Sequence, residues 1–187
     1  MKQNLFIISG PSGAGEDSII EGLKKYIPIE RVITTTTRKM RLGEFNGNPY
    51  YFISKEKFQK EIKKNNFLEY AEEYNEQYYG VTKQEIDRIK NSSKIGIWKV
   101  EYQGVIAIKK IMPEIKSIFI TAPLNILKKR IKSRGGFTEE QIEERMEYTK
   151  KWLSYENIYD YKIINQEGKL EEAIQKTLAL IKKLSPM

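Results

Sequence analysis

Residues 5–18 read LFIISGPSGAGEDS, and this segment decides the fold. Its first five residues form an apolar run that is typical of a buried strand. The run leads directly into a glycine-rich turn at residues 10–15, and residues 17–26 then carry apolar side chains at helical spacing. A buried strand, a glycine turn and a helix in this order predict the first unit of an α/β domain.

The same alternation returns in the second half of the chain. Apolar runs predict further core strands at residues 95–100, 115–120 and 161–165. Helical spacing predicts helices at residues 104–112, 125–133, 139–152 and 169–184, and capping-box patterns mark helix starts at Thr82 and Thr138. Strands that alternate with helices indicate a parallel sheet flanked by helices.

Residues 31–81 interrupt this alternation and predict an inserted subdomain. The stretch is rich in β-branched and aromatic residues, and strands are expected at residues 31–37, 50–53, 67–71 and 78–80. Ser54 is expected to cap a helix that reaches Lys64, and a turn is expected at Asn75.

The composition removes several classes of chemistry. The 187-residue chain has no cysteine and no histidine, which excludes disulfides, thiol nucleophiles, Ser-His-Asp triads and histidine metal sites. Catalysis must therefore rest on carboxylates, lysine, arginine, hydroxyls, backbone N–H groups and a hard metal ion. The net charge of +8 suits nucleotides, nucleic acid or an acidic surface, but also a lysine-rich solvated surface. No apolar run is long enough to span a bilayer and no signal peptide is evident, so we expect a cytoplasmic protein.

The turn after the first strand has the skeleton of a phosphate-binding loop. Four residues separate Gly10 from Gly15, the glycines let backbone N–H groups turn inward, and the helix N-terminus adds its dipole. The complete motif continues with lysine and then serine or threonine. Glu16 and Asp17 stand in those places here. The local motif therefore leaves open both a phosphate site and an ordinary glycine turn.

The whole chain resembles the guanylate kinase family, beginning with residues 5–18 apart from Glu16 and Asp17. Further motifs of that family follow in order and at the family's spacing. They are Thr36-Thr37-Arg38, Arg41-x-Gly43-Glu44, Gly47-x-x-Tyr50-x-Phe52, residues 67–71 (FLEYA), Tyr78-Tyr79-Gly80, Glu101-x-Gln103-Gly104, Arg134-Gly135 and residues 160–165. So many ordered motifs favour the phosphate site over the ordinary turn.

The resemblance implies a P-loop NTPase fold in one domain, residues 1–187. It implies a CORE of residues 1–33, 83–123 and 156–187, a nucleoside monophosphate (NMP) binding subdomain of residues 34–82 and a LID of residues 124–155. The implied reaction transfers the γ-phosphoryl group of Mg²⁺-bound ATP to a nucleoside monophosphate. In the family this acceptor is GMP or dGMP. Closure would exclude water from the site. We expect the protein to bind these nucleotides and not to bind nucleic acid or membrane. We expect it to be a monomer or a homodimer.

The resemblance also implies roles for individual residues. The acceptor phosphate would bind Arg38, Arg41, Tyr50 and Tyr79, and the acceptor base would face Thr34, Glu69, Val81 and Glu101. The transferring phosphoryl group would be clamped by the LID residues Arg130, Arg134 and Arg145. ATP would lie on Ser12, Gly13, Ala14, Gly15, Glu16, Asp17 and Ser18, with Asn165 near the adenine edge. The plainer interpretations are a solvated basic loop at the acceptor arginines, a surface ion pair at Arg145 and a strand-end turn at Asn165.

The base-binding residues depart from the family pattern in three places. Thr34 replaces a serine but keeps a hydroxyl, whereas Val81 replaces a serine or threonine and Glu101 replaces an aspartate. The hydroxyl lost at Val81 leaves guanine O6 short of one donor, which costs about 1–3 kcal/mol in a closed site. A pocket respecified for dTMP, with Val81 as an apolar wall, is therefore an alternative to GMP. Neutral drift at the pocket edge is the other explanation.

The charges around the expected ATP phosphates depart from the pattern as well. Lys99 stands where the family has an aspartate, on a strand that the resemblance places beside the first one. We hypothesise that Lys99 reaches the phosphates in place of the missing lysine, or pairs with Glu16, and that Asp17 binds Mg²⁺. The alternative is a catalytically inactive binding module with the same fold.

Overall fold

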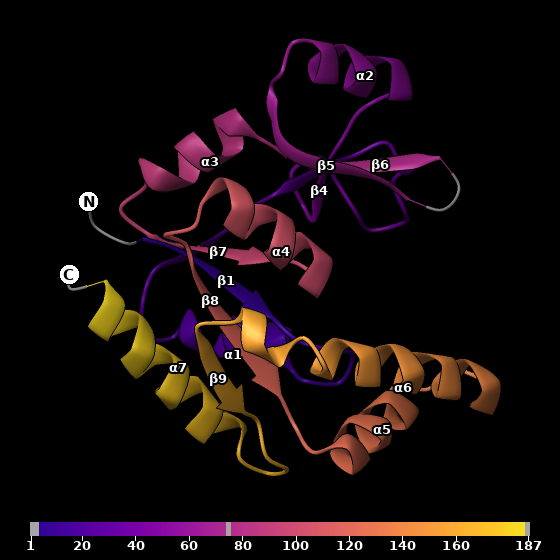
Figure 1. Cartoon of the computed structure of the whole chain (residues 1–187), viewed down its shortest axis with the longest axis vertical. Helices are drawn as coiled ribbons and strands as arrows, with labels where there is room; N and C mark the ends of the chain where they lie inside the picture. The colour runs from indigo at the N-terminus through magenta and orange to yellow at the C-terminus, as the bar shows by residue number, and fades with distance from the viewer. Residues whose placement is uncertain (1–3, 74–75, 186–187) are drawn as a thin grey trace.

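The computed structural model describes residues 4–73 and 76–185, and its central feature is a five-stranded sheet (Figure 1). Neighbouring strands of this core sheet are parallel throughout. Their order is β2 (Ile29–Arg31), β7 (Ile95–Lys99), β1 (Leu5–Ser9), β8 (Lys116–Thr121) and β9 (Tyr161–Ile164). The predicted parallel α/β architecture is confirmed, because the four core strands expected from their apolar runs all lie in this sheet.

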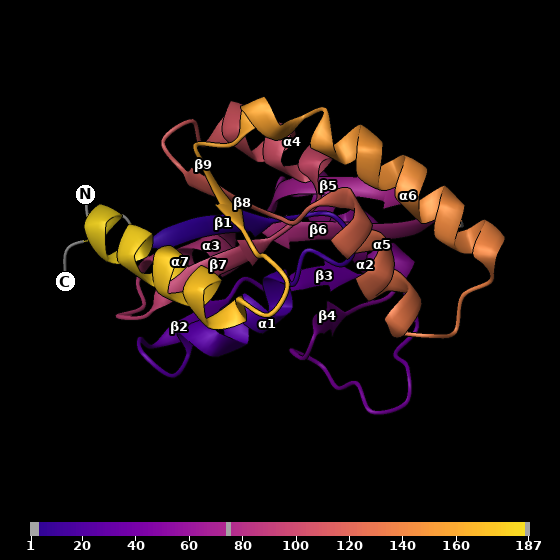
Figure 2. The ribbon, with the colours of Figure 1, turned by 90° about the horizontal axis from the view of Figure 1, so that it is seen from below.

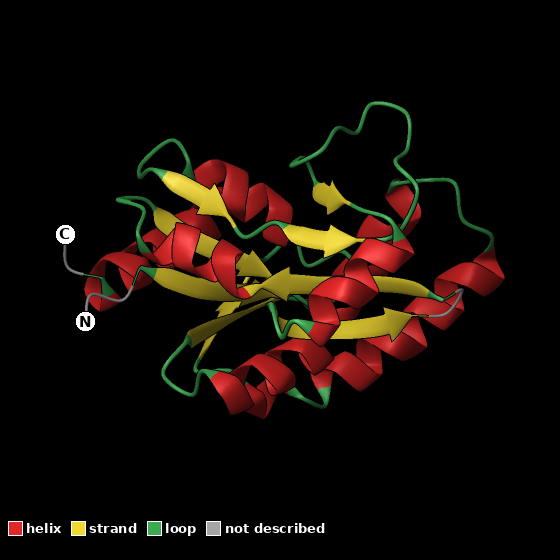
Figure 3. Ribbon diagram, turned by 90° about the horizontal axis from the view of Figure 1, so that it is seen from above, coloured by secondary structure: helices red, strands yellow, loops and turns green. Residues whose placement is uncertain are grey.

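Helices cover both sides of the core sheet, as the red and yellow layers of Figure 3 show. Most of their bounds agree with the sequence prediction within a few residues. They are α1 (Glu16–Leu23), α2 (Lys55–Lys63), α3 (Lys83–Lys90), α4 (Tyr102–Ile111), α5 (Leu124–Ser133), α6 (Glu139–Leu153) and α7 (Leu170–Leu184). Among the described helices, none has the length and apolarity that a bilayer span requires.

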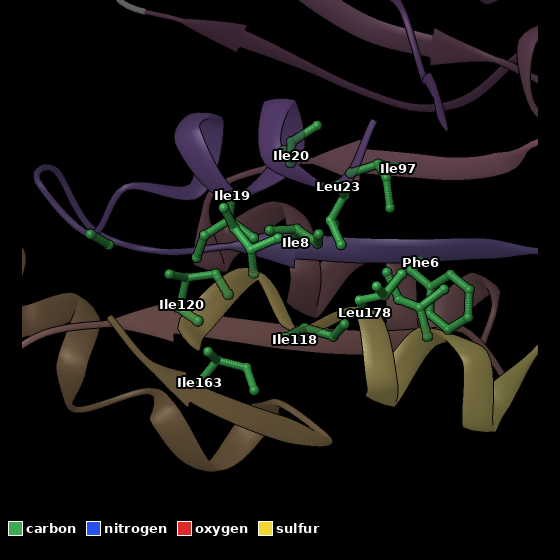
Figure 4. Packing of buried hydrophobic residues seen from close by; sticks show 14 of the residues in the cluster. Phe6, Ile8, Ile19, Ile20, Leu23, Ile97, Ile118, Ile120, Ile163 and Leu178 are labelled. Carbon is green, nitrogen blue, oxygen red and sulfur yellow. The ribbon is translucent and has the colours of Figure 1, made fainter. Parts of the chain in front are cut away.

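Strand β1 is buried on both faces of the core sheet. Phe6 and Ile8 pack with residues of α1 and α7 in the largest hydrophobic cluster (Figure 4). Leu5 and Ile7 pack on the opposite side, with residues of α3 and α4. Burial on both faces explains why this strand is a continuous apolar run rather than an alternating one.

A second sheet lies within residues 34–82. Its strand order is β4 (Tyr50–Phe52), β3 (Thr34–Thr36), β6 (Gln77–Thr82) and β5 (Phe67–Glu73). Helix α2 places Phe58 against this sheet, where its ring stacks on Phe67 at 4.1 Å and on Tyr78 at 5.2 Å between centroids. Ser54 caps α2 as predicted, since its side chain accepts a hydrogen bond from the Lys57 N–H. The expected turn at Asn75 lies outside the described residues.

Residues 31–37, expected to form one extended segment, are divided between the two sheets. Arg31 pairs with Ile97 in the core sheet, and the Val32 N–H still donates to the Ile97 carbonyl. The next N–H, that of Ile33, donates instead to the Glu85 carboxylate at 2.7 Å, and β3 begins one residue later. Residues 32–33 are therefore the connection between the two sheets.

Helices α5 and α6 lie at the lower end of the molecule in Figure 1 and the second sheet at the upper end, while Figure 2 shows both on the side away from the termini. The capping box predicted at Thr138 is present, with reciprocal hydrogen bonds to Gln141. The one predicted at Thr82 is only half formed. Thr82 accepts a hydrogen bond from the Glu85 N–H, but the Glu85 side chain turns to the Ile33 N–H instead of the cap.

Candidate active site

A cleft of about 1120 Å³ opens at the carboxyl ends of β2, β7 and β1, the edge at which parallel sheets bind ligands. Its walls come from the glycine turn (residues 10–15), the 47–50 loop and the α5–α6 region. Ten of the residues predicted for the site line it, namely Ser12, Gly13, Glu16, Asp17, Thr34, Tyr50, Lys99, Glu101, Arg134 and Arg145. The structure thus brings residues from all three predicted subdomains to one cavity.

The glycine turn has a backbone that favours glycine at two positions. Gly13 and Gly15 have φ angles of 87° and 89°, in the left-handed region. A Cβ at Gly10 would lie 2.3 Å from the Ile120 carbonyl oxygen, so the turn also packs closely on β8. Helix α1 begins immediately afterwards, at Glu16. This is the geometry in which backbone N–H groups and a helix N-terminus face an anion.

Two residues expected to touch ATP contact the backbone of the glycine turn. Asn165 is buried, and its Nδ2 donates to the Ala14 carbonyl at 2.8 Å. Arg130 donates to the carbonyl oxygens of Gly13, Asn165 and Gln166 at 3.1–3.3 Å. Neither residue lines the cleft. The adenine contact expected of Asn165 and the phosphoryl clamp expected of Arg130 stay predictions, and in this structure both side chains contact backbone carbonyls at the glycine turn and the end of β9.

Lys99 lies at the glycine turn, on the strand next to β1. Parallel pairing of β1 with β7 sets Ile8 opposite Lys99. The Lys99 ammonium lies 2.6 Å from Asp17 Oδ2 and 3.6 Å from Glu16 Oε1. Both carboxylates belong to the first turn of α1. The pairing with Glu16 matches one form of the sequence hypothesis, and the shorter contact with Asp17 is new.

The pKa values of the Glu16 and Asp17 carboxyls shift in opposite directions at this site. Burial raises the pKa of the Glu16 carboxyl, even though Lys99 and Arg134 act against the rise. Burial also opposes ionisation of Asp17, but the hydrogen bond and charge of Lys99, together with Arg31, outweigh it and lower its pKa. Asp17 is therefore held as an anion between two cations.

Both oxygens of Asp17, the side chain expected to bind Mg²⁺, accept hydrogen bonds from cations in this structure. Its Oδ2 accepts from Lys99, and its Oδ1 accepts from Arg31 at 3.1 Å. Across residues 4–73 and 76–185 there is no group of three or more acidic side chains that could hold a metal ion. Mg²⁺ at nucleotide sites usually keeps several waters and is held by one or two carboxylates together with substrate phosphates. The Mg²⁺ role of Asp17 therefore stays a prediction.

Arg38 is held firmly on the second sheet. Its Nη2 donates to both carboxylate oxygens of Glu44, at 2.7 and 2.9 Å, and its guanidinium lies over the rings of Tyr50 and Phe52 at 5.4 and 5.5 Å. The Tyr79 ring packs edge-on against Tyr50. Such pre-orientation suits an arginine that meets a phosphate.

Arg41 is exposed beside this cluster. Its N–H also donates to Glu44, at 2.8 Å. With Arg38 and Lys39, it lines a second hollow, of about 550 Å³. Glu44 belongs to the same sequence motif as Arg41, but the motif alone assigns it no role.

The residues expected to face the base are not all in one place. Burial raises the pKa of the Glu69 carboxyl to about 7, and the Val81 N–H bonded to that carboxyl opposes the rise. The Glu101 carboxylate accepts a hydrogen bond from the Tyr148 hydroxyl of α6. Thr34 lines the cleft, whereas Glu69 does not.

Val81 does not form the apolar pocket wall that the dTMP alternative required. Its side chain is fully buried in a cluster that includes Trp98 and Ile86. It belongs to the core between the second sheet, α3 and β7, and it does not line the cleft. Side chains alternate between the two faces of β6, and that of Val81 points into the core. The valine therefore contributes core packing at the position where the family pattern has a hydroxyl.

Two residues that contact predicted site residues were not themselves predicted from the sequence. Arg31, at the end of β2, contacts Asp17, and Tyr148 contacts Glu101. Arg31 was hidden in a β-branched segment that carried no motif. Tyr148 lies one helical turn before Trp152, on the face of α6 that packs near Tyr102, and this spacing was the available signal.

Comparison with known proteins agrees with this geometry. The family model described as guanylate kinase matches residues 2–184. A guanylate kinase of Fusobacterium nucleatum is 37% identical over 179 residues, which cover 95% of each chain. One of Buchnera aphidicola is 42% identical over 167 residues, covering 87% of this chain and 80% of the relative. A crystal structure of guanylate kinase from Anaplasma phagocytophilum shares the fold, with a TM-score of 0.72 at 22% identity over 100% of this chain and 88% of that one. The chain belongs to the guanylate kinase family.

Proposed function

We propose that the protein transfers the γ-phosphoryl group of ATP to GMP. The observation that carries the proposal is the cleft of about 1120 Å³, which joins the glycine turn, the second sheet and the α5–α6 region in one site. Relatives named guanylate kinase support the same donor and acceptor. The case for dTMP depended on a pocket wall at Val81, and the burial of that side chain in the core removes its basis.

We propose the subdomain division CORE 1–33, 83–123 and 156–187, NMP-binding 34–82 and LID 124–155. The connections at residues 32–33 and 82–83 support it, because the second sheet is joined to the core sheet only through them among the described strands. Movement about these connections and about the α5–α6 region would close the cleft and exclude water from the transfer.

GMP is proposed to bind on the second sheet. Arg38 and Arg41 meet its phosphate, with the Tyr50 and Tyr79 rings beside them, and Glu44 holds Arg38 in position. Glu69 and Glu101 would accept hydrogen bonds from guanine N–H groups, and Thr34 would offer its hydroxyl. Guanine presents two adjacent N–H donors on one edge, so a carboxylate pairs with it better than with thymine.

ATP is proposed to place its phosphates on the glycine turn, whose N–H groups and helix dipole favour anions. Lys99 supplies the cation that the turn itself lacks, from the adjacent strand, and Arg134 and Arg145 supply charge from the other wall of the cleft. Transfer of a phosphoryl group needs alignment and neutralisation of charge more than proton transfer. A chain without histidine or cysteine can meet both needs.

The test is ADP release from ATP and MgCl₂ with GMP, dGMP, dTMP, UMP, CMP and AMP, using wild type and Lys99→Met. We expect turnover with GMP or dGMP, and a loss of about a hundredfold in kcat for the variant, the size typical of a removed transition-state contact. Lys182→Met, an exposed lysine on α7, controls for the loss of one positive charge.

Full turnover by Lys99→Met would overturn the role of Lys99. Preference for dTMP would overturn the acceptor. No turnover with any monophosphate, despite GMP binding in calorimetry, would identify the inactive binding module. Urea unfolding of both variants separates a lost contact from a lost fold.

A further inference from the structure

Arg31 is a second cation at the proposed ATP site, on a strand that carries no family motif. It ends β2, lines the cleft, and its Nη2 lies 3.1 Å from Asp17 Oδ1 and 3.3 Å from Glu21 Oε1. Asp17 and Glu21 are four residues apart on α1, so both carboxylates face the same guanidinium. Arg31 is therefore bound to the helix that follows the glycine turn.

The backbone of Arg31 is held as well as its side chain. It pairs with Ile97 in the core sheet, and its carbonyl accepts a hydrogen bond from Arg88 Nη2 at 3.2 Å. The side chain thus starts from a fixed point and reaches α1 at two carboxylates. It would have to give up two ion-pair contacts on α1 to follow a ligand.

Lys99 also has two acidic partners on α1. One ammonium group faces two carboxylates, Asp17 at 2.6 Å and Glu16 at 3.6 Å. The phosphates of ATP would be further anions at the same place. If Lys99 turned to them without another cation nearby, Asp17 would be left as an unpaired carboxylate facing a polyanion, which is unfavourable.

The two cations use different oxygens of Asp17. Arg31 donates to Oδ1 and Lys99 to Oδ2, so one can depart while the other remains. We propose that Arg31 is a positioning residue for ATP, which keeps Asp17 neutralised so that Lys99 is free to bind the phosphates. The proposal rests on the proposed function, in which Lys99 serves the donor phosphates, and it assigns Asp17 to the protein's own cations rather than to a metal.

This arrangement predicts a dependence between Arg31 and Asp17. Without Arg31, Asp17 retains Lys99, and ATP binding has to break that pair. Without the charge of Asp17, Lys99 keeps only the more distant Glu16 at 3.6 Å, and Arg31 has no charge on Asp17 to neutralise. Loss of Arg31 should therefore weaken ATP binding in the native background but not in an Asp17→Asn background.

The experiment is a double-mutant cycle of wild type, Arg31→Met, Asp17→Asn and the double variant. ATP is titrated by calorimetry without acceptor, once with MgCl₂ and once with EDTA. We expect Arg31→Met to raise the Kd for ATP about tenfold, a coupling of ordinary size between contacting charges. The double variant should bind within about twofold of Asp17→Asn. Lys182→Met, which removes a distant charge, should bind as wild type does.

Steady-state kinetics separate positioning from a structural role. Arg31→Met should raise the KM for ATP and leave kcat and the KM for GMP unchanged, with urea unfolding as the check on the fold. Equal weakening by Arg31→Met in both backgrounds would overturn the proposal, because Arg31 would then act on ATP directly or through the fold. Loss of ATP binding by Asp17→Asn in MgCl₂ but not in EDTA would also overturn it, in favour of a metal ligand. If the enzyme turns over but the effects of the two substitutions on the Kd for ATP are additive, only this inference is refuted. If no monophosphate gives ADP release, the proposed function is refuted.

Discussion

Glu69 should make the affinity for GMP depend on pH near neutrality. Burial raises the pKa of its carboxyl to about 7, against the opposing hydrogen bond from the Val81 N–H. Only the ionised carboxylate can accept from both guanine N–H donors. GMP should therefore bind more tightly as the pH rises through 7, and binding below pH 7 should release protons.

The size of the effect follows from the pKa. With a pKa of about 7, the carboxyl is ionised in about one tenth of the free protein at pH 6 and in about nine tenths at pH 8. Apparent affinity scales with the competent fraction, so this residue alone should weaken the Kd at pH 6 by about tenfold relative to pH 8. A glutamate whose pKa kept its ordinary value of 4.5 would contribute almost nothing over this range.

The same shift has a consequence for stability. The folded pKa lies above the unfolded value, so the contribution of Glu69 is fully present below pH 4.5 and is lost as the pH rises through about 7. The loss amounts to about 3 kcal/mol. Replacement by glutamine should flatten this part of the pH–stability curve.

The assay is calorimetric titration of GMP at pH 6, 7 and 8 into wild type, Glu69→Gln and Glu72→Gln. The phosphate of GMP titrates near pH 6 in its own right, and its effect is common to all three proteins. Glu72 is an exposed carboxylate on the same strand and is the matched control. The ratio of the Glu69→Gln Kd to the wild-type Kd should grow about tenfold from pH 6 to pH 8. Parallel profiles for these two proteins would refute the reasoning.

Three further substitutions test other parts of the structure. Arg38→Lys removes the paired hydrogen bonds to Glu44 and should raise the KM for GMP by at least about tenfold, with an unchanged KM for ATP in steady-state kinetics; an equal rise in both would contradict a role confined to the acceptor. Arg88→Met leaves the Glu85 carboxylate, 3% exposed, without its cation and should lower the free energy of unfolding by about 3 kcal/mol. Urea unfolding should then show partial recovery when Glu85→Gln is added, and no recovery would count against the pair. Phe58→Ala removes the ring that α2 stacks on the second sheet and should cost about 3–5 kcal/mol in urea unfolding, whereas a loss below about 1 kcal/mol would mean that the subdomain is stabilised elsewhere.

Much of the fold could be predicted because its signals are local. The apolar runs, the helical spacing and the cap at Thr138 each depend on residues within a few positions of one another. Prediction failed where a local pattern met a distant partner. Thr82 and Glu85 have the sequence of a capping box, yet the Glu85 carboxylate binds the Ile33 N–H and Arg88, because two chain connections meet at the start of α3.

The candidate site was predicted less completely than the fold, for the same reason. The motifs identified which residue types gather at the cleft, but they did not say what each side chain touches. Arg130 and Asn165 bind carbonyl oxygens of the glycine turn, and Val81 enters the core. Motif position does not reveal these contacts, because each depends on which segments the fold packs against the residue.

The sequence by itself determined the α/β alternation, the glycine turn, the family and the absence of histidine and cysteine chemistry, because periodicity, motif order and composition are properties of the chain alone. Tertiary structure alone decided that Asp17 is the nearer partner of Lys99 and that Arg31 shares this carboxylate. The parallel register of β1 with β7 sets Lys99 opposite Ile8, and the position of β2 at the edge of the sheet brings Arg31 to the same carboxylate of Asp17. Charges 14 and 82 positions away from Asp17 in sequence meet there because the order and register of strands distant in sequence bring them together.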